Sequence, residues 1–131
     1  MTQVKKTVII VEDEPDTAEM FAEMMNLSGY QVFKSYGGTP AINLITNRKP
    51  DAVVLDVMMP DLSGLDVLRF IRRDPRLEHI PVILVSAKSM PNDIKDGIDA
   101  GASMYLTKPV SYNDLKSAVD QVLGVSSQTP E

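Results

Sequence analysis

The sequence predicts an α/β fold, a doubly wound parallel sheet of five strands with five helices, and three observations predict it. Five short runs rich in β-branched residues alternate strictly with segments of helical spacing, which is typical of parallel strands with helices on both faces. Three of the runs are almost wholly apolar, as strands buried on both faces are. The length of 131 residues suffices for one packed domain. The runs are TVIIV (7–11), QVFKS (31–35), DAVVLD (51–56), PVILVS (81–86) and SMYLT (103–107).

The first two helices follow the first two strand runs. In the first helix, apolar residues recur at i, i+3, i+4 and i+7, which gives the helix one buried face. These residues are Ala18, Phe21, Ala22 and Met25. Gly29 then stands where the end of a helix favours a left-handed residue. In the second helix, we expect Thr39 to be the N-cap and Pro40 the first helical residue.

Serine residues open the third and fifth helices. Ser63 is followed three residues later by Asp66, and Ser111 is followed three residues later by Asp114. A serine N-cap with an acidic residue in the first turn is a typical helix start. The fourth helix is shorter and ends at Gly101. Its apolar positions are Met90, Ile94 and Ile98.

The composition is that of one globular domain, with 44% hydrophobic and 24% charged residues. We expect the domain to span residues 1–123 and a flexible tail to span 124–131. The formal net charge of −5 disfavours direct binding to nucleic acid or to anionic membranes, because both need a basic surface. The chain has no cysteine, which excludes a disulfide, a thiolate nucleophile and a cysteine metal site. The N-terminal stretch is neither a secretory signal nor a transmembrane helix, so we expect a cytoplasmic protein.

Acidic and polar side chains gather at one edge of this predicted sheet. Glu12 and Asp13 follow the first strand, Asp56 closes the third, Ser86 closes the fourth, and Lys108 lies just past the fifth. Right-handed crossovers bring the carboxyl ends of all strands to one edge, where ligands bind in doubly wound folds. We therefore expect these five side chains to share one site.

Three carboxylates in one cleft repel one another unless a cation offsets their charge. Mg²⁺ is the expected cation, because it takes oxygen ligands and typically uses one or two carboxylates. We assign Asp13 and Asp56 as direct ligands and Glu12 as a ligand acting through water. The only histidine, His79, precedes the fourth strand, so a histidine-rich zinc site is excluded. A metal, a free carboxylate, a hydroxyl and a lysine together suit phosphoryl transfer to an aspartate.

Four segments carry a resemblance to a known family. VEDEP, VVLDVMMPDLSGLDVL, VILVSAK and MYLTKPV resemble the signature segments of response-regulator receiver domains, the phosphoryl acceptors of two-component signalling. The four segments occur in family order and at family spacing, and the similarity covers about residues 6 to 123. The resemblance implies a flavodoxin-like sheet with strand order 2-1-3-4-5.

The resemblance also implies residue roles. Asp56 is the implied phosphoacceptor. The carboxylates of Asp13 and Asp56 and the Met58 carbonyl are the implied Mg²⁺ ligands, with Glu12 acting through water and Mn²⁺ as a substitute metal. Lys108 is implied to pair with phosphoryl oxygens.

Further implied roles concern the switch and the loops around it. Ser86 is implied to hydrogen-bond the phosphoryl group, and Tyr105 to turn from solvent into the space that Ser86 vacates. The bond before Pro109 is expected to be cis, and Pro60 and Gly64 are expected to shape the turn after the phosphoacceptor.

The implied function is a phosphorylation-activated switch in a two-component phosphorelay. A sensor histidine kinase or phosphotransfer protein would supply the phosphoryl group. The face formed by the fourth helix, fifth strand and fifth helix would then control a downstream protein or an output domain absent from this chain, with a phosphorylation-dependent dimer as one outcome. We expect the chain to catalyse only its own phosphorylation and dephosphorylation, and not to be an enzyme otherwise.

Three alternatives stay open at this stage. An aspartyl-phosphate-forming phosphohydrolase would be expected to carry a second aspartate two residues after the nucleophile, where this chain has Met58. A flavodoxin-like electron carrier is disfavoured because the acidic edge would repel a flavin phosphate. A degenerate receiver that only binds partners would be expected to lack part of the active-site set.

Overall fold

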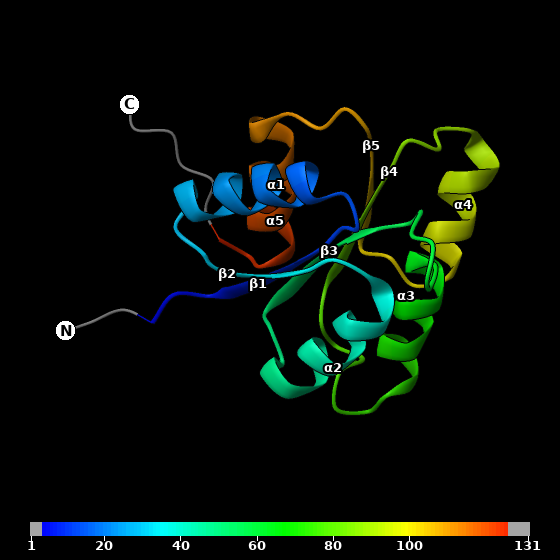
Figure 1. Cartoon of the computed structure of the whole chain (residues 1–131), viewed down its shortest axis with the longest axis horizontal. Coiled ribbons are helices and arrows are strands. Elements are labelled where there is room, and N and C mark those ends of the chain that lie inside the picture. The colour runs from blue at the N-terminus through cyan, green and yellow to red at the C-terminus, as the bar shows by residue number, and fades with distance from the viewer. Residues whose placement is uncertain (1–3, 126–131) are drawn as a thin grey trace.

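The computed structural model describes residues 4–125 as a five-stranded parallel sheet between two layers of helices (Figure 1). The strand order is β2-β1-β3-β4-β5, as the resemblance implied. The strands are β1 (Thr7–Val11), β2 (Gln31–Ser35), β3 (Ala52–Asp56), β4 (Val82–Ser86) and β5 (Met104–Thr107). The helices are α1 (Pro15–Leu27), α2 (Gly38–Arg48), α3 (Gly64–Arg73), α4 (Pro91–Asp99) and α5 (Tyr112–Val122).

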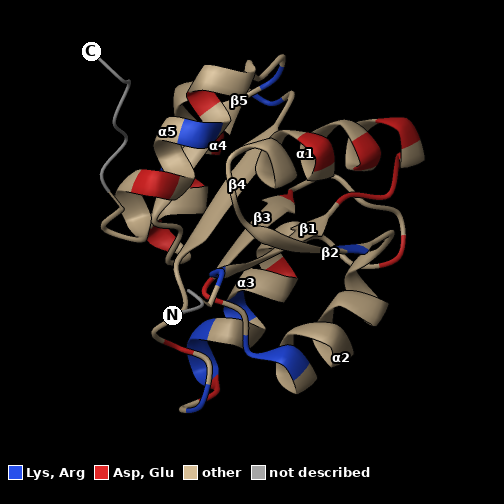
Figure 2. Cartoon of the chain, turned by 90° about the vertical axis from the view of Figure 1, so that its left-hand side faces the viewer, with Lys and Arg blue, Asp and Glu red and all other residues tan. Residues whose placement is uncertain are grey.

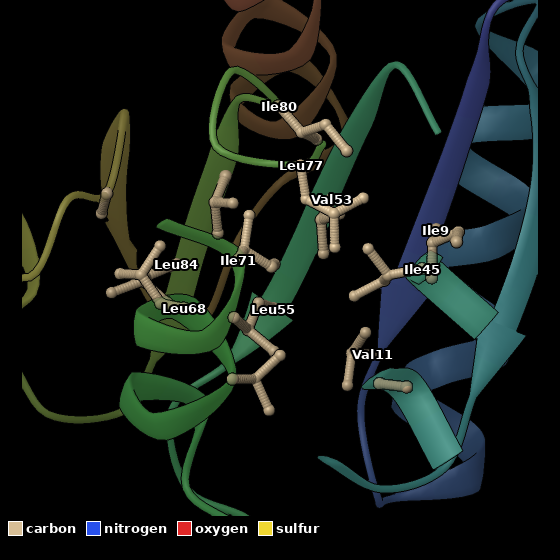
Figure 3. Packing of buried hydrophobic residues seen from close by; sticks show 14 of the residues in the cluster. Ile9, Val11, Ile45, Val53, Leu55, Leu68, Ile71, Leu77, Ile80 and Leu84 are labelled. Atoms are coloured by element: carbon tan, nitrogen blue, oxygen red, sulfur yellow. The ribbon is translucent and has the colours of Figure 1, made fainter. Parts of the chain in front are cut away.

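Two apolar cores fill the spaces on the two faces of the sheet. Successive residues of a strand point to opposite faces, so Val8 and Ile10 enter one core while Ile9 and Val11 enter the other. The first core contains buried residues of α1 and α5, and the second contains buried residues of α2 and α3. Figure 3 shows the second core, where side chains of α3 pack against the middle strands. All residues of β3 and β4 are buried, which explains why both strands are apolar up to their last residues, Asp56 and Ser86.

Most helix ends agree with the sequence. The Ser63 side chain accepts a hydrogen bond from the Leu65 amide at 3.1 Å, and the Ser111 side chain accepts one from the Asp114 amide at 3.0 Å. Gly29, which follows α1, has a φ of 95° and therefore lies in the region that favours glycine. Three strands begin one residue later than expected, at Ala52, Val82 and Met104.

The predicted N-cap of α2 is wrong. The helix begins at Gly38, so Thr39 lies inside its first turn and Gly37 is the N-cap. Gly37 has no side chain to cap with, and the carboxylate of Asp61 takes that role from the loop before α3. Asp61 accepts hydrogen bonds from the amides of Gly38 at 3.1 Å and Thr39 at 2.9 Å. These bonds, led by the one from Thr39, lower the pKa of Asp61 to about 2.

The predicted C-terminal tail falls mostly outside the described residues. Of residues 124–131, the structure describes Gly124 and Val125, and both are exposed. Among the residues described, no helix is both long and apolar enough to cross a lipid bilayer.

Candidate functional site

The structure brings the five predicted site residues to one edge of the sheet. Asp56 is the last residue of β3 and Ser86 the last of β4, while Glu12 follows β1 directly. Asp56 is 5% exposed and Glu12 is 2% exposed, whereas Asp13 lies at intermediate depth. Carboxylate oxygens of Glu12, Asp13 and Asp56 lie within 4.8 Å of one another.

Lys108 supplies the positive charge of this cluster. Its Nζ lies 2.9 Å from Glu12 Oε1 and 3.7 Å from Asp56 Oδ2. Burial disfavours the ammonium, but the two carboxylates outweigh burial and raise the pKa of Lys108 above its ordinary value. The bond between Lys108 and Pro109 is cis, the isomer expected from the sequence. One lysine leaves three neighbouring carboxylates with an excess of negative charge.

The pKa of Asp56 is raised in this environment. Burial, and next the hydrogen bonding and negative charge of Glu12, raise the pKa of Asp56 to about 7. Lys108 and the Met58 amide act in the opposite direction, and the latter donates a hydrogen bond to Asp56 Oδ1 at 3.2 Å. A cation bound at this edge would therefore stabilise the ionised form of Asp56, which burial and Glu12 disfavour.

The carboxylate cluster fits a hard divalent cation. Its donors are oxygens from two consecutive loop residues and a strand end, and Mg²⁺ prefers oxygen ligands. Asp13 is less buried than its two partners, which leaves the cluster open to solvent on that side. Mg²⁺ keeps several waters when it binds proteins, so an open side suits this ion better than a closed cage does.

The loop after Asp56 must pass very close to the strand end. A Cβ on Gly64 would lie 2.1 Å from the Asp56 carbonyl oxygen and 2.8 Å from Val57 Cα, so only glycine fits. The Gly64 amide donates to the Val57 carbonyl at 2.9 Å, which closes the loop. Met58 and Pro60 are both exposed on this loop, and Met58 is 53% exposed.

Ser86 and Tyr105 meet at the backbone of Lys88. The fully buried Ser86 hydroxyl accepts a hydrogen bond from the Lys88 amide at 3.0 Å. The Tyr105 hydroxyl donates to the Lys88 carbonyl at 2.8 Å. The Tyr105 side chain is half-buried and its ring contacts α4, while its hydrogen bond to Lys88 lies at the exposed surface. The turn of this side chain on phosphorylation stays a prediction.

Sequence reasoning missed two residues near the site, Gly97 and Arg72, and the role of the Lys88 main chain. Lys88 links the two switch residues through main-chain atoms, which no side-chain pattern reveals. Gly97 of α4 lies against Leu84 of β4 and Tyr105 of β5, and Arg72 of α3 donates to the Gly101 carbonyl in the segment between α4 and β5. A glycine inside a helical pattern was a usable signal, because glycine weakens a helix unless close packing requires it.

Charge is distributed unevenly over the molecule. Figure 2 shows acidic residues on α1 and at the turn that leads into it, and basic residues towards the ends of α2 and α3. The basic residues at those helix ends are Arg48, Arg72 and Arg73. The site edge of the sheet is therefore the acidic end of the protein, which suits a cation.

Comparisons with known proteins agree with this geometry. The sequence model of the response regulator receiver domain matches residues 8–120. The polar-differentiation response regulator DivK of Brucella anthropi is 33% identical over 119 residues, which are 91% of this chain and 97% of DivK. The phosphate regulon transcriptional regulatory protein PhoB of Pseudomonas aeruginosa is 36% identical over 120 residues, which are 92% of this chain and 52% of PhoB.

Solved structures of related proteins have the same fold as this chain. A response regulator from Chloroflexus aurantiacus superposes with a TM-score of 0.88 at 29% identity, covering 92% of this chain and 99% of the other. The receiver domain of the sensor histidine kinase PA1611 from Pseudomonas aeruginosa has a TM-score of 0.85 at 26% identity, with coverages of 92% and 99%. That neighbour has a magnesium ion coordinated in its active site cleft. The buried carboxylates, the lysine beside them and these matches together show that the chain belongs to the response regulator receiver domain family.

Proposed function

We propose that this receiver domain is a phosphorylation-activated switch in which Asp56 accepts the phosphoryl group. The observation that carries the proposal is the position of Asp56. It is a nearly buried carboxylate at the end of a central strand, with Glu12 and Asp13 on one side and the Lys108 ammonium 3.7 Å from its Oδ2. Each neighbour has a part in phosphoryl transfer, which needs positioning and charge stabilisation more than covalent chemistry.

Asp13, Asp56 and the Met58 carbonyl would hold Mg²⁺, with Glu12 acting through water, and Mn²⁺ would substitute. The bound ion supplies a positive charge that neutralises the acceptor carboxylate and the incoming phosphoryl oxygens. The magnesium ion in the related PA1611 receiver supports this assignment. The three carboxylate oxygens within 4.8 Å of one another are the feature of this chain that supports it.

The reaction transfers a phosphoryl group between two nucleophiles. An Asp56 carboxylate oxygen forms a bond to phosphorus, while the bond from phosphorus to the donor's imidazole nitrogen breaks. The imidazole keeps the electron pair and takes up a proton from solvent. Lys108 would turn from Glu12 to a phosphoryl oxygen, since its Nζ already lies near both carboxylates. Hydrolysis of the acyl phosphate returns Asp56 and inorganic phosphate, so the domain catalyses only changes in its own state.

The switch would pass through the Lys88 backbone. Ser86 accepts from the Lys88 amide, and turning its hydroxyl to the phosphoryl group would break that bond. Tyr105 holds the carbonyl of the same residue. The loop between β4 and α4 would therefore rearrange, and phosphorylation would shift a pre-existing equilibrium of the α4, β5 and α5 face.

The residues beside Asp56 favour a phosphorylated form that is not unusually short-lived. Met58 and Lys88 are both exposed and line one open groove with Val57 and Leu65. Neither side chain supplies a carboxylate that could orient an attacking water towards the acyl phosphate. Rapid spontaneous loss of the phosphoryl group in the presence of Mg²⁺ would contradict this part of the proposal.

We propose a sensor histidine kinase or a phosphotransfer protein as the phosphodonor in the cytoplasm. A downstream protein, an output domain outside this chain or a second phosphorylated copy would read the changed face. A phosphohydrolase is less well supported, because Met58 occupies the position where such enzymes need a second acid. A degenerate receiver is also less well supported, because each expected site residue is present at the sheet edge.

Intact-mass spectrometry tests the proposal directly. The protein is incubated with acetyl phosphate, with and without Mg²⁺, and compared with the Asp56→Asn variant. We expect one phosphoryl group on the wild type only, and only with the metal. Equal labelling of the variant, or no labelling of the wild type, would overturn the assignment of Asp56. A matched variant, Asp51→Asn at the opposite end of β3, should be labelled like the wild type.

A further inference from the structure

Helix α4 is held against the sheet by very few side chains. Of its nine residues, all of which the structure describes, only Gly97 is buried. Ile98, the next residue, is 45% exposed, and Met90 at the N-cap is 66% exposed. Glycine is a poor residue for a helix interior, because it has more backbone freedom to lose than alanine has. Its presence at the one buried position therefore requires a packing reason.

The packing reason is the ring of Tyr105. A Cβ on Gly97 would lie 2.8 Å from Tyr105 Cδ2 and 3.0 Å from Tyr105 Cε2, and 2.9 Å from Leu84 Cδ1. Atoms in folded proteins do not approach this closely, so even alanine would force a neighbour to move. Leu84 is fully buried in β4, whereas Tyr105 is half-buried on the edge strand β5. The tyrosine ring is therefore the neighbour that can move away from a methyl group at position 97.

The helix itself has little freedom to retreat, because its C-terminal end is tied down. Arg72 of α3 donates from Nε to the Gly101 carbonyl at 2.9 Å. The same guanidinium donates from Nη1 to the carbonyls of Glu78 at 3.0 Å and Ile80 at 2.7 Å. Arg72 thereby joins the segment after α4 to the loop before β4. A methyl group at position 97 would therefore displace the ring more readily than it would displace the helix.

We propose that Gly97 is a positioning residue, whose missing side chain admits the Tyr105 ring beneath α4 and so permits the position in which the Tyr105 hydroxyl reaches the Lys88 carbonyl. The proposal rests on the proposed function for its consequence, because the position of the ring matters only if Tyr105 reports on Asp56. With a methyl group at position 97, the ring turns out to solvent and its hydroxyl leaves the Lys88 carbonyl. Phosphorylation of Asp56 would then no longer be coupled to a ring beneath α4.

Fluorine NMR tests the position of the ring without any phosphodonor. The chain has four tyrosines, so labelling with 3-fluorotyrosine gives four signals, and the Tyr105→Phe variant identifies the one from Tyr105. We expect Gly97→Ala to shift that signal towards the value of free fluorotyrosine and to leave the other three in place. Ile98→Ala, at the exposed neighbouring position of the same helix, is the matched control and should move none of the four. An unchanged Tyr105 signal in Gly97→Ala would overturn the proposal.

A stability cycle separates positioning from a general packing defect. Alanine forms helices better than glycine, so Gly97→Ala should cost less stability once the ring is absent, although the close contact with Leu84 Cδ1 remains. We therefore expect Gly97→Ala to lower the melting temperature in the wild type and to lower it much less in a Tyr105→Ala background. A decrease of the same size in both backgrounds would overturn the proposal. If Gly97→Ala alone does not fold, recovery of folding in the double variant is the expected result, and failure of the double variant to fold counts against it.

Phosphorylation is then measured separately. Intact mass after treatment with acetyl phosphate and Mg²⁺ should show Gly97→Ala labelled to the same extent as the wild type, because Gly97 touches none of the site carboxylates. The wild-type Tyr105 signal should respond to labelling, and the Gly97→Ala signal should lose that response. Absence of labelling in both proteins would refute the proposed function while leaving the ring measurement to decide the role of Gly97. Loss of labelling in Gly97→Ala alone would count against a role confined to positioning Tyr105.

Discussion

Asp56→Asn should stabilise the metal-free protein, although it removes the proposed acceptor. Folding raises the pKa of Asp56 from 3.8 to about 7, chiefly through burial and then through Glu12. The folded protein therefore holds a proton that the unfolded chain has released, and wild-type stability falls as the pH rises from about 4 to about 7. Asparagine carries no charge at any pH, so the variant escapes this loss.

The size of the stability difference between the Asp56→Asn variant and the wild type follows from the pKa shift of Asp56. With a rise from 3.8 to about 7 and about 1.4 kcal/mol for each pKa unit, the ceiling is about 4 kcal/mol. Solvent at the open side of the cluster and relaxation of its side chains reduce that figure, so we expect about 2 kcal/mol at pH 8. The difference between variant and wild type should vanish near pH 4, where Asp56 is protonated in the folded protein.

Urea denaturation of both proteins from pH 4 to pH 8, in the presence of a chelator, measures this difference. Asp16→Asn, which makes the same chemical change at an exposed position of α1, should show no such rise with pH. Saturating Mg²⁺ should reverse the order, because an ion at about 100 times its Kd adds about 2.7 kcal/mol to the state that binds it. A variant no more stable than the wild type at pH 8 without metal would refute the reasoning, as would a difference that does not change with pH.

Three further variants test other parts of the structure. Lys108→Met should strengthen Mg²⁺ binding several-fold, because it removes a competing cation 3.7 Å from Asp56. Calorimetric titration measures this affinity, and unchanged or weaker binding would contradict the prediction. Asp61→Ala should lower the melting temperature at pH 7 but not at pH 2, because a pKa of about 2 gives stability above 3.8 that is lost as the pH falls through 2. Tyr30→Phe should cost about 1 to 2 kcal/mol in urea denaturation, because it removes a buried hydrogen bond to Asp120, and a neutral result would show that the bond has no net value.

The sequence was most informative where structure depends on neighbouring residues. Strands β3 and β4 are buried on both faces, so they have runs of consecutive apolar residues, which distinguish them from exposed segments. The serine caps of α3 and α5 work within three residues of chain, so Ser63 and Ser111 could be identified by spacing alone. The site residues could be grouped for a related reason, because the carboxyl ends of parallel strands must share one edge.

Contacts between distant segments were beyond the sequence. Asp61 caps α2 from 22 or 23 residues away, and nothing near Thr39 indicates that the cap comes from another loop. The apolar spacing of α4 predicted a helix but not its shallow packing, because its apolar positions Met90 and Ile98 are exposed and the helix meets the sheet through Gly97. The Tyr105 hydroxyl donates to a main-chain carbonyl, and every residue has one, so no sequence pattern identifies this contact.

The central strand and the helix at the margin should differ widely in local stability. Asp56 ends β3, which lies in the middle of the sheet and buries all five of its residues. We expect amide protons of such a strand to exchange with solvent only when the whole domain unfolds, whereas the N-terminal turns of α4, which bury no residue and lie away from the end tied by Arg72, can open on their own. The proposed phosphoacceptor thus lies on a central, fully buried strand. The responding helix α4 lies at the margin, where local opening requires little free energy. A modest change in free energy at Asp56 can therefore alter how often α4 opens without loosening the strand that holds the aspartate.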